Sequence, residues 1–431
     1  MKKAKNIFLG KKILVYGLGR TGISSYKFLK NKAKVHLFDD NQKINLKIKQ
    51  NLIKLGDVQK IKFDLIIISP GIDISNCKLS KFLKKNFSKI HTDLDVFSSF
   101  YKNKSITITG TNGKSTTATI LYKVLLDQKK DVRLIGNIGN PVLSEKKISK
   151  RTIFVIEASS YQLDYSKLFS TKYAIILNIS ADHIERHKSL KNYINAKFKL
   201  LESQTKKCIA YVKKDDEHIN KKINLKRFNC KIIKVDTKKV DKFFRNLNND
   251  YFLTETNIEN LSFVIKLSKK LKLKNYLLFK TIKNFKGLKY RQQIIFKKKN
   301  LTIINDSKST SFSSTAGILK AKSNIFWLVG GIFKKGDKLN LKKKDFKNVK
   351  AFVYGKNNKF FNKELRYKVK FENFINLDKA LKNIFSSIKK EKLVHNTILF
   401  SPCAASFDIF KNFEDRGLYF NRLIKKYLNG I

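Results

Sequence analysis

The sequence predicts an α/β protein of three domains, each built around a mainly parallel sheet. Short apolar runs alternate with amphipathic helical stretches throughout the 431 residues, as in parallel strands joined by crossover helices. Within the runs, apolar and polar residues do not alternate, so both faces of each strand should be buried. The length also exceeds what one hydrophobic core usually holds. The runs expected to be strands are 12–17, 34–39, 64–69, 105–110, 152–157, 173–178, 301–306, 325–331, 351–355 and 397–401.

Three blocks follow from the order of these runs. We expect a Rossmann-like domain over residues 1–100, a central domain of the P-loop ATPase type over 101–287, and a second Rossmann-like domain over 288–431. The lysine-rich span 205–250 is poorly patterned, and we interpret it as peripheral strands and loops of the central block. In parallel sheets, functional residues cluster just after the strands, at their carboxyl ends.

The charge of the chain first suggests a nucleic-acid partner. The formal net charge is +60, yet only ten of the 93 basic residues are arginine, and they form neither a tail nor a patch. Base-specific readers favour arginine for its bidentate fork. Lys, Ile, Asn, Phe and Tyr are all abundant and share A/T-rich codons, so genome composition accounts for the charge. We therefore expect no specific nucleic-acid partner.

The cysteines and the amino terminus bear on the cellular compartment. Four scattered cysteines contain no C-x-x-C pair, which argues against a disulfide framework or a zinc site and fits a reducing cytosol. Lys11 and Lys12 break the first apolar run, and no stretch reaches the roughly 18 apolar residues of a membrane helix. We expect a cytoplasmic protein without membrane insertion, and a monomer.

The stretch Ile106–Thr117, ITITGTNGKSTT, has the order of elements that binds a nucleotide triphosphate. A strand-like run leads into a glycine-bounded turn, whose backbone N–H groups can surround phosphate oxygens, and the helix start adds unpaired N–H groups. The general phosphate loop has a glycine five residues before Gly113, where Ile108 stands here, so this loop is shorter. The alternative is an ordinary strand–turn–helix with a chance lysine.

Two residues of this loop carry its expected chemistry. Lys114 can neutralise the outer phosphates, and the hydroxyl of Ser115 can ligate Mg²⁺. The residues expected to contact the nucleotide phosphates are Gly110, Thr111, Asn112, Gly113, Lys114, Ser115 and Thr116.

Polar residues after two other strands of the central block suggest a metal site. Glu157 ends one strand, and Asn178 ends the next and leads into Asp182 and His183. A carboxylate one strand away from a phosphate loop can hold Mg²⁺ directly or through water. The alternative for Glu157 is capping or exposure to solvent. Lys197 stands among other lysines on an expected helix, and the sequence predicts a surface residue there.

The first block contains a glycine fingerprint of a dinucleotide-binding turn. The string Gly17–Gly22, GLGRTG, follows a strand, and Asp39 closes the next strand at the spacing of a ribose contact. By itself the string indicates NAD or FAD. Two alternatives stay open, another nucleotide diphosphate or glycines used only for packing. A second turn, Ser69–Gly71, could line the same crevice.

The end of the second block and the third block offer weaker signals. Asn257 and Asn260, in the second block, are three residues apart and share a helix face. Arg291 and Asp306 could reach a nucleotide in the second block only if the domains closed on one another. The run Ser401–Gly417, SPCAASFDIFKNFEDRG, changes abruptly to small and hydroxyl residues after a strand. It could bind an anionic substrate through backbone N–H groups, or it could be a plain strand-to-helix connection.

Together these strings resemble the Mur ligases, ATP-dependent enzymes that form amide bonds in peptidoglycan precursor synthesis. GTNGKSTT and the N-x-x-x-D-H string at Asn178–His183 resemble the family as a whole. The strings GLGRTG, SPGI, INDSKST and SPCAASFDIFKNFEDRG resemble its D-glutamate-adding branch, and the D-N-P-R string of the diamino-acid-adding branch is absent. The resemblance covers all three blocks in order.

The resemblance implies a role for each matching residue. Two Mg²⁺ ions are expected. ATP and the first ion would be bound by Lys114, Ser115 and Glu157. His183 would lie beside the second ion, and Lys197 would carry a carbamate that helps to hold metal. The residues that would hold the nucleotide from its other side are Asn257, Asn260, Arg291 and Asp306. The implied contacts of the UDP-sugar, UDP-N-acetylmuramoyl-L-alanine, are Leu18, Arg20, Thr21, Asp39, Gly71 and Asn137. Those of D-glutamate are Lys308, Lys334, Ser406 and Phe413.

Three positions depart from the family pattern, and three other readings compete with it. Thr256 and Tyr290 stand where the family often has histidine, and Ser311 stands where asparagine is common. A folylpolyglutamate synthase of the same fold would leave the first-block crevice without a purpose. An NAD-dependent oxidoreductase would leave the second phosphate loop unexplained. A nucleotide-dependent nucleic-acid-binding protein would rest on the charge alone.

Overall fold

The computed structural model describes residues 6–41, 51–238, 247, 249–298, 300–334, 336–390 and 395–429. Two compact units divide the chain. Unit 1 comprises residues 1–245 and 259–281, and unit 2 comprises residues 246–258 and 282–431. The helix α10 (Glu255–Lys270) is shared between them. The α/β class with mainly parallel sheets is confirmed, while the domain boundaries after residues 100 and 287 remain predictions.

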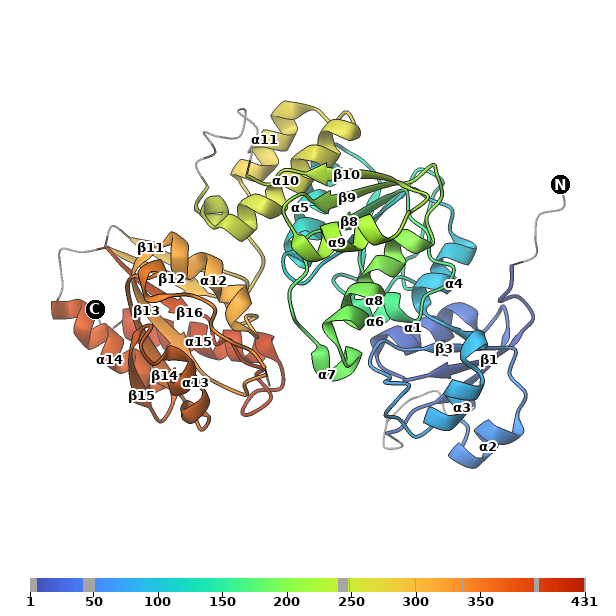
Figure 1. Cartoon of the computed structure of the whole chain (residues 1–431), viewed down its shortest axis with the longest axis horizontal. Coiled ribbons are helices and arrows are strands. Elements are labelled where there is room, and N and C mark those ends of the chain that lie inside the picture. Colours follow the sequence, from blue (N-terminus) through green and yellow to red (C-terminus); the bar gives the residue numbers. More distant parts are fainter. Residues whose placement is uncertain are drawn as a thin grey trace. The chain divides into compact units, whose positions relative to one another are not determined.

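Unit 1 begins with a four-stranded parallel sheet of order β2-β1-β3-β4, blue in Figure 1. The apolar side chains of its central strand, from Ile13 to Tyr16, are all fully buried, as expected for a strand covered on both faces. The strands are β1 (Lys12–Tyr16), β2 (Lys34–Phe38), β3 (Leu65–Ile68) and β4 (Ile90–His91). The helices are α1 (Arg20–Leu29), α2 (Leu55–Lys60), α3 (Ser80–Lys85) and α4 (Asp93–Phe100), with the 3₁₀ turn η2 (Phe87–Lys89).

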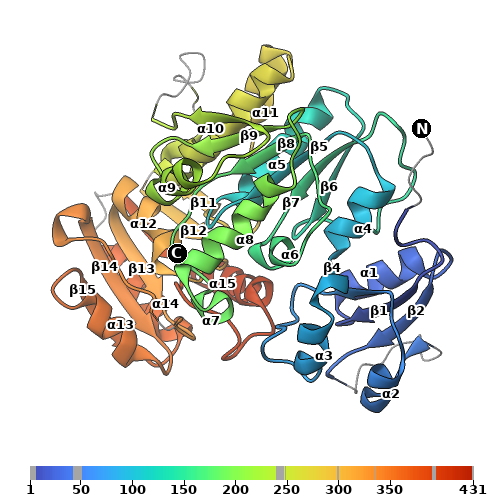
Figure 2. The same ribbon diagram turned by 45° about the vertical axis from the view of Figure 1, so that its right-hand side comes forward.

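The second sheet of unit 1 has six parallel strands in the order β10-β9-β8-β5-β7-β6. Strand β5 lies between β7 and β8, so the loop after β5 lies between the loops that follow these two strands. Helices α6 and α8 pack against each other beside this sheet (Figure 2). The strands are β5 (Ser105–Thr109), β6 (Val132–Gly136), β7 (Ile153–Glu157), β8 (Tyr173–Ile176), β9 (Ile209–Lys213) and β10 (Lys231–Val235). The helices are α5 (Lys114–Asp127), α6 (Ser160–Asp164), α7 (Ile184–His187), α8 (Leu190–Glu202), α9 (Glu217–Leu225) and α11 (Asn275–Lys283), whose last two residues belong to unit 2.

The two sheets of unit 1 are joined by buried acids at the start of α4. Burial alone would raise the pKa of Asp95, but hydrogen bonds from His91 and Ser166 hold it below its ordinary value. The Asp95 carboxylate also accepts the backbone N–H groups of Lys167 and Leu168. Asp93 accepts Nε2 of Gln162, and burial raises its pKa to about 6.

Unit 2 holds a six-stranded sheet of order β11-β12-β16-β13-β14-β15, parallel except for the antiparallel pair β11 and β12. Because β12 and β16 are neighbours, the loops after them start side by side. The strands are β11 (Gln293–Lys298), β12 (Leu301–Asn305), β13 (Ser323–Val329), β14 (Lys347–Tyr354), β15 (Lys370–Phe374) and β16 (Asn396–Phe400). The helices are α12 (Phe312–Ala321), α13 (Asn358–Leu365), α14 (Leu377–Lys390) and α15 (Phe413–Leu428), with the 3₁₀ turns η4 (Asp250–Leu253) and η5 (Lys343–Asp345).

Every run expected to be a strand is one. The span 205–250 supplies the edge strand β10, its neighbour β9 and the helix α9, in agreement with its peripheral assignment. Its residues 239–246 and 248 lie outside the described part of the chain. The sequence did not predict β4, β6, β11 and β15, which all lie at the edge of a sheet. β4 has only two residues, and β11 and β15 have no fully buried residue. Among the described residues, no helix is long and apolar enough to cross a membrane.

Candidate functional site

The loop between β5 and α5 has the backbone of a phosphate cradle. Gly110 has φ = 151° and Gly113 has φ = 84°, and a side chain at Gly113 would be strained in this left-handed region. A Cβ there would also lie 2.0 Å from Oδ1 of Asn260, so only glycine fits. Helix α5 begins at Lys114 and points its first N–H groups toward the loop.

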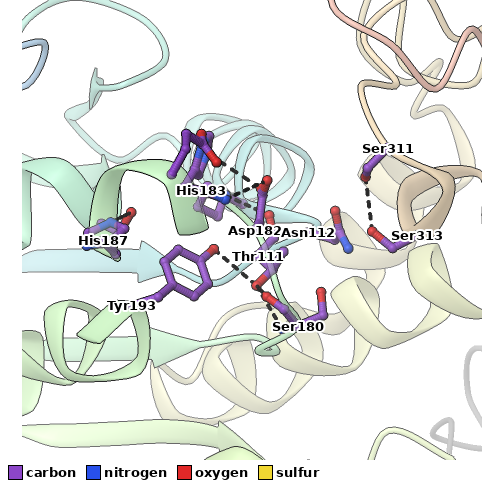
Figure 3. Close-up of polar contacts among 12 residues, drawn as sticks. Thr111, Asn112, Ser180, Asp182, His183, His187, Tyr193, Ser311 and Ser313 are labelled. Atoms are coloured by element: carbon purple, nitrogen blue, oxygen red, sulfur yellow. Dashed lines mark hydrogen bonds and ion pairs between the residues drawn. The ribbon is translucent and has the colours of Figure 1, made fainter. Parts of the chain in front are cut away.

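Residues of the loop after β8 and of α8 hold the cradle in shape. Asn178 accepts the backbone N–H of Asn112 at 2.8 Å and donates to the Asn112 carbonyl at 3.2 Å. The Thr111 hydroxyl meets the hydroxyl of Tyr193 at 3.1 Å and both backbone groups of Ser180 (Figure 3). The hydrogen bonds of the Thr111 side chain and of the Asn112 backbone therefore stabilise the conformation of the loop. Tyr193 and Ser180 were missed from the sequence, because neither carries a recognisable spacing.

Two lysines converge on the cradle. Lys114 donates Nζ to the carbonyls of Gly110 and Thr111, both at 2.8 Å. Lys197 of α8 donates Nζ to the same Gly110 carbonyl at 2.8 Å and is only 1% exposed. The expectation of a surface residue at Lys197 is wrong, because Lys197 lies on the buried face of α8 with Tyr193 and Leu201. Burial, and then the charge of Lys114, lowers the pKa of Lys197 well below its usual range.

A buried carboxylate stands beside the cradle. In the parallel pair of β5 and β7, Glu157 is the register partner of Ile108, two residues before the loop. It is 1% exposed; Oε1 accepts Nδ2 of Asn137 at 2.8 Å, and Oε2 has no hydrogen-bond partner. The alternative of an exposed or capping Glu157 is thus excluded.

These residues fit a divalent cation with oxygen ligands. The described residues contain no group of three His, Cys, Asp or Glu side chains that could hold a metal. Mg²⁺ is usually bound by one or two protein oxygens together with substrate phosphates and water, and the unpaired Oε2 of Glu157 with the Ser115 hydroxyl is a donor set of that kind.

His183 lies in a strained turn after β8. It precedes α7 with a left-handed φ of 55°, and its Nε2 lies 3.5 Å from Oδ2 of Asp182 (Figure 3). Its ring lies 5.0 Å from that of Tyr161. Next to it, His187 meets the Ser160 hydroxyl at 3.0 Å, and burial lowers its pKa to about 4. His187 is therefore neutral at physiological pH.

The two asparagines expected to act as a pair have different surroundings. Asn260 abuts Gly113 in unit 1, and its buried Nδ2 has no hydrogen-bond partner. Asn257 belongs to unit 2, where its Nδ2 donates to the Tyr251 carbonyl at 2.7 Å and to Oε1 of Gln292 at 3.2 Å. Only Asn260 is thus placed at the phosphate loop within one unit.

The glycine turn of the first sheet is tightly packed. Gly17 has φ = 89°, and a Cβ on Gly22 would lie 1.8 Å from the Gly17 carbonyl oxygen. Asp39 accepts the Leu18 N–H at 2.6 Å, so its carboxylate fixes the turn. Of the other residues expected at a UDP-sugar, Thr21 is half-buried, and Arg20, Gly71 and Asn137 are exposed.

In unit 2 the residues expected at the amino acid lie on the loops after three neighbouring strands and at the start of α15. Nζ of Lys308 lies 3.8 Å from the ring centre of Phe413. Ser406 is buried and Lys334 is half-buried. Burial raises the pKa of Asp306 to about 7, and its Oδ1 and Oδ2 accept the N–H of Gln292 and the hydroxyl of Ser401.

The departures from the family pattern have local roles in unit 2. Tyr290 packs on α15, where a Cβ on Gly417 would lie 2.3 Å from its ring. Ser311 precedes α12 and meets the Ser313 hydroxyl at 3.0 Å (Figure 3). The Thr256 hydroxyl faces Gly317, where an added Cβ would lie 3.1 Å from it. Arg291, next to Tyr290, is half-buried.

Comparison with known proteins shows the family of this chain. A model of the Mur ligase middle domain matches residues 108–279, and one of the MurD-like N-terminal domain of Mur ligases matches residues 11–90. The UDP-N-acetylmuramoylalanine--D-glutamate ligase of Rickettsia bellii (strain RML369-C) is 31% identical over 95% of this chain and 96% of its own. The enzyme of that name from Rickettsia prowazekii (strain Madrid E) is 33% identical over 98% and 99%.

Solved structures share the fold. The MurF ligase of Thermotoga maritima in complex with ADP matches 99% of both chains with a TM-score of 0.60 at 12% identity. At that identity the likeness concerns the fold alone. The relatives of about one-third identity cover nearly the whole chain, and the chain therefore belongs to the Mur ligase family.

Proposed function

We propose that this chain is an ATP-dependent ligase that joins D-glutamate to UDP-N-acetylmuramoyl-L-alanine in peptidoglycan precursor synthesis. The observation that carries the proposal is the cradle at the carboxyl edge of the central sheet, where Lys114, Lys197 and the unpaired carboxylate oxygen of Glu157 accompany a glycine-bounded phosphate loop. Relatives named UDP-N-acetylmuramoylalanine--D-glutamate ligase match nearly the whole chain.

In the first step, the alanine carboxylate of the UDP-sugar attacks the γ-phosphorus of ATP, giving an acyl phosphate and ADP. Carboxylate and triphosphate are both anionic, so their approach needs compensating charge. Lys114 lies on the loop and can turn from the Gly110 and Thr111 carbonyls to the phosphates. Fixed N–H groups at the start of α5 stabilise the transferred phosphoryl group without reorganising.

Bound Mg²⁺ would supply further charge to the phosphate oxygens. Glu157 and Ser115 would hold it, with Asn137 fixing the orientation of the Glu157 carboxylate. We propose a second ion near His183 and a carbamate on Lys197. Only an unprotonated amine can react with CO₂, and the burial that lowers the pKa of Lys197 raises the fraction of its amine in that form.

In the second step, the amine of D-glutamate attacks the acyl carbon, and phosphate leaves from a tetrahedral species. Lys308, Lys334, Ser406 and Phe413 are proposed to bind the amino acid. Lys308 and Lys334 would pair with its carboxylates, and Phe413 holds Lys308 by a cation–π contact. We propose that the enzyme acts in the cytoplasm as a monomer and has no specific nucleic-acid partner.

The test is product formation from the three substrates. The purified chain is incubated with ATP, Mg²⁺, UDP-N-acetylmuramoyl-L-alanine and D-glutamate, and the products are identified by mass spectrometry. The proposal predicts the UDP-sugar increased by one glutamate less one water, with one ADP per product. Tight DNA or RNA binding at physiological salt without any such product would favour the nucleic-acid-binding alternative.

A further inference from the structure

Helix α15 carries a buried arginine to which no role has been given. Arg416 is 1% exposed. Its guanidinium donates to Ser307 twice, from Nη2 to the carbonyl at 2.7 Å and from Nε to the hydroxyl at 3.2 Å. It also donates to the carbonyls of Ala404 at 2.9 Å and Ala405 at 3.2 Å. Three nitrogens of one rigid fork thus bind two separate loops.

These loops carry the residues proposed to bind the amino acid. Ser307 precedes Lys308 in the loop after β12, and Ala405 precedes Ser406 in the loop after β16. The backbone of Ala405 also exchanges both hydrogen bonds with Ile332, two residues before Lys334. The loops bearing Lys308, Lys334 and Ser406 are therefore linked through the acceptors of Arg416.

The fourth residue proposed to contact D-glutamate lies on α15 itself. Phe413 lies one turn before Arg416 on α15, and its carbonyl accepts the Ser307 hydroxyl at 2.8 Å. A Cβ on Gly331 would lie 3.3 Å from Nη1 of Arg416, so the loop backbone after β13 passes close to the guanidinium. A substitution at Arg416 would remove the four hydrogen bonds that tie the loops after β12 and β16 to α15.

No acid forms a direct ion pair with Arg416 among the described residues, and the charges of Asp408 and Asp306 act on it only from a greater distance. Among the described residues, no carboxylate oxygen lies within ion-pair distance of its guanidinium, and all four acceptors are uncharged oxygens. An arginine remains protonated even when buried. Its positive charge is therefore available to an anion bound by the neighbouring loops, where the local dielectric is low.

We propose that Arg416 is a positioning residue for the amino-acid substrate, which sets the spacing of the loops after β12, β13 and β16 and adds a positive charge that has no direct carboxylate partner. The inference rests on the proposed function, because it takes the ligand of these loops to be an amino acid with two carboxylates. A simple core role would predict general destabilisation and no preference among the substrates.

The experiment compares steady-state kinetics of the full-length wild type with those of Arg416→Lys and Arg416→Ala. Lysine keeps the charge but cannot reach both loops. Alanine removes the charge and all the hydrogen bonds to the loops. We expect KM for D-glutamate to rise about 10-fold or more in Arg416→Lys and further in Arg416→Ala, while KM for ATP and for the UDP-sugar stays within about 2-fold. Millimolar guanidinium should partly restore the low KM in Arg416→Ala and leave Arg416→Lys unchanged.

Arg422→Lys is the matched control, because Arg422 is an exposed arginine on the same helix. It should leave all three KM values unchanged. If Arg416→Ala does not fold by circular dichroism, Ser307→Ala removes one acceptor of the fork and should raise KM for D-glutamate alone.

Equal increases in all three KM values, or an unchanged KM for D-glutamate in a folded Arg416→Lys enzyme, would overturn the inference while leaving the proposed function intact. A wild type that accepts no D-glutamate would overturn the proposed function, and this inference with it.

Discussion

Asn137 donates Nδ2 to Oε1 of Glu157 at 2.8 Å, and the other carboxylate oxygen of Glu157 is left buried and unpaired. Leaving a buried carboxylate oxygen without a partner is costly. Such an atom at the edge of a phosphate loop is explained by a ligand that binds it, and Mg²⁺ is the ligand that fits its chemistry.

Replacing Glu157 by glutamine should therefore weaken metal-dependent turnover. Glu157→Gln keeps the shape and the contact with Asn137 but removes the charge. We expect kcat to fall by roughly 100-fold or more, with a higher Mg²⁺ concentration for half-maximal rate, measured by ADP release across a Mg²⁺ titration. Glu202→Gln, on the exposed surface of α8, is the control. A Mg²⁺ profile equal to that of the wild type would remove Glu157 from the metal site.

Lys114 should be essential for turnover. Lys114→Ala removes the positive charge nearest the phosphates, and we expect kcat to fall by roughly 100-fold or more, with the thermal midpoint little changed. Lys123→Ala changes an exposed lysine of the same helix and should have no effect. A Lys114→Ala enzyme as fast as the control would exclude the loop from the mechanism.

Tyr193 should influence nucleotide binding through Thr111. Tyr193→Phe removes the hydroxyl that meets Thr111 at 3.1 Å in a buried site. One such hydrogen bond contributes about 0.5–1.5 kcal/mol, so we expect a rise in KM for ATP of roughly 2- to 12-fold. Tyr276→Phe, at a tyrosine that is 64% exposed, is the control. The account fails here if KM for ATP is unaltered and KM for D-glutamate changes instead.

Asp93 should make the stability of unit 1 depend on pH. Burial raises its pKa from 3.8 to about 6, so between these values the native state binds more protons than the unfolded state. The contribution of Asp93 to the free energy of unfolding is then lost as pH rises from about 4 to 7. Asp93→Asn cannot ionise and should escape this loss.

The measurement is urea unfolding of both proteins at several pH values. The difference in unfolding free energy, Asp93→Asn minus wild type, should rise with pH by about 1–3 kcal/mol. Taking the difference cancels the titrating groups that do not interact with Asp93. The neighbouring Asp95 does interact with it, but its pKa lies below 3.8, so Asp95 stays ionised over this pH range. A difference that stays constant or falls with pH contradicts the prediction.

The fold was largely predictable because buried parallel strands are continuous apolar runs. Strand β15 was not predicted, because it lies at a sheet edge and its sequence, KFENF, has exposed polar residues. The phosphate loop and Glu157 were predictable from their place after strands. The burial of Lys197 was not, because the lysines around it obscured its place between Tyr193 and Leu201 on one helical face. The roles of Tyr193, Ser180 and Arg416 depend on contacts between distant segments, which no local pattern records.

The central claim concerns which amino acid is joined, and one measurement tests it most directly. ADP release is followed with UDP-N-acetylmuramoyl-L-alanine and, in turn, D-glutamate, L-glutamate, L-alanine and L-lysine. The account predicts ADP release with D-glutamate and background rates with the other three. Release that depends on one of the others, with D-glutamate at background, would contradict it.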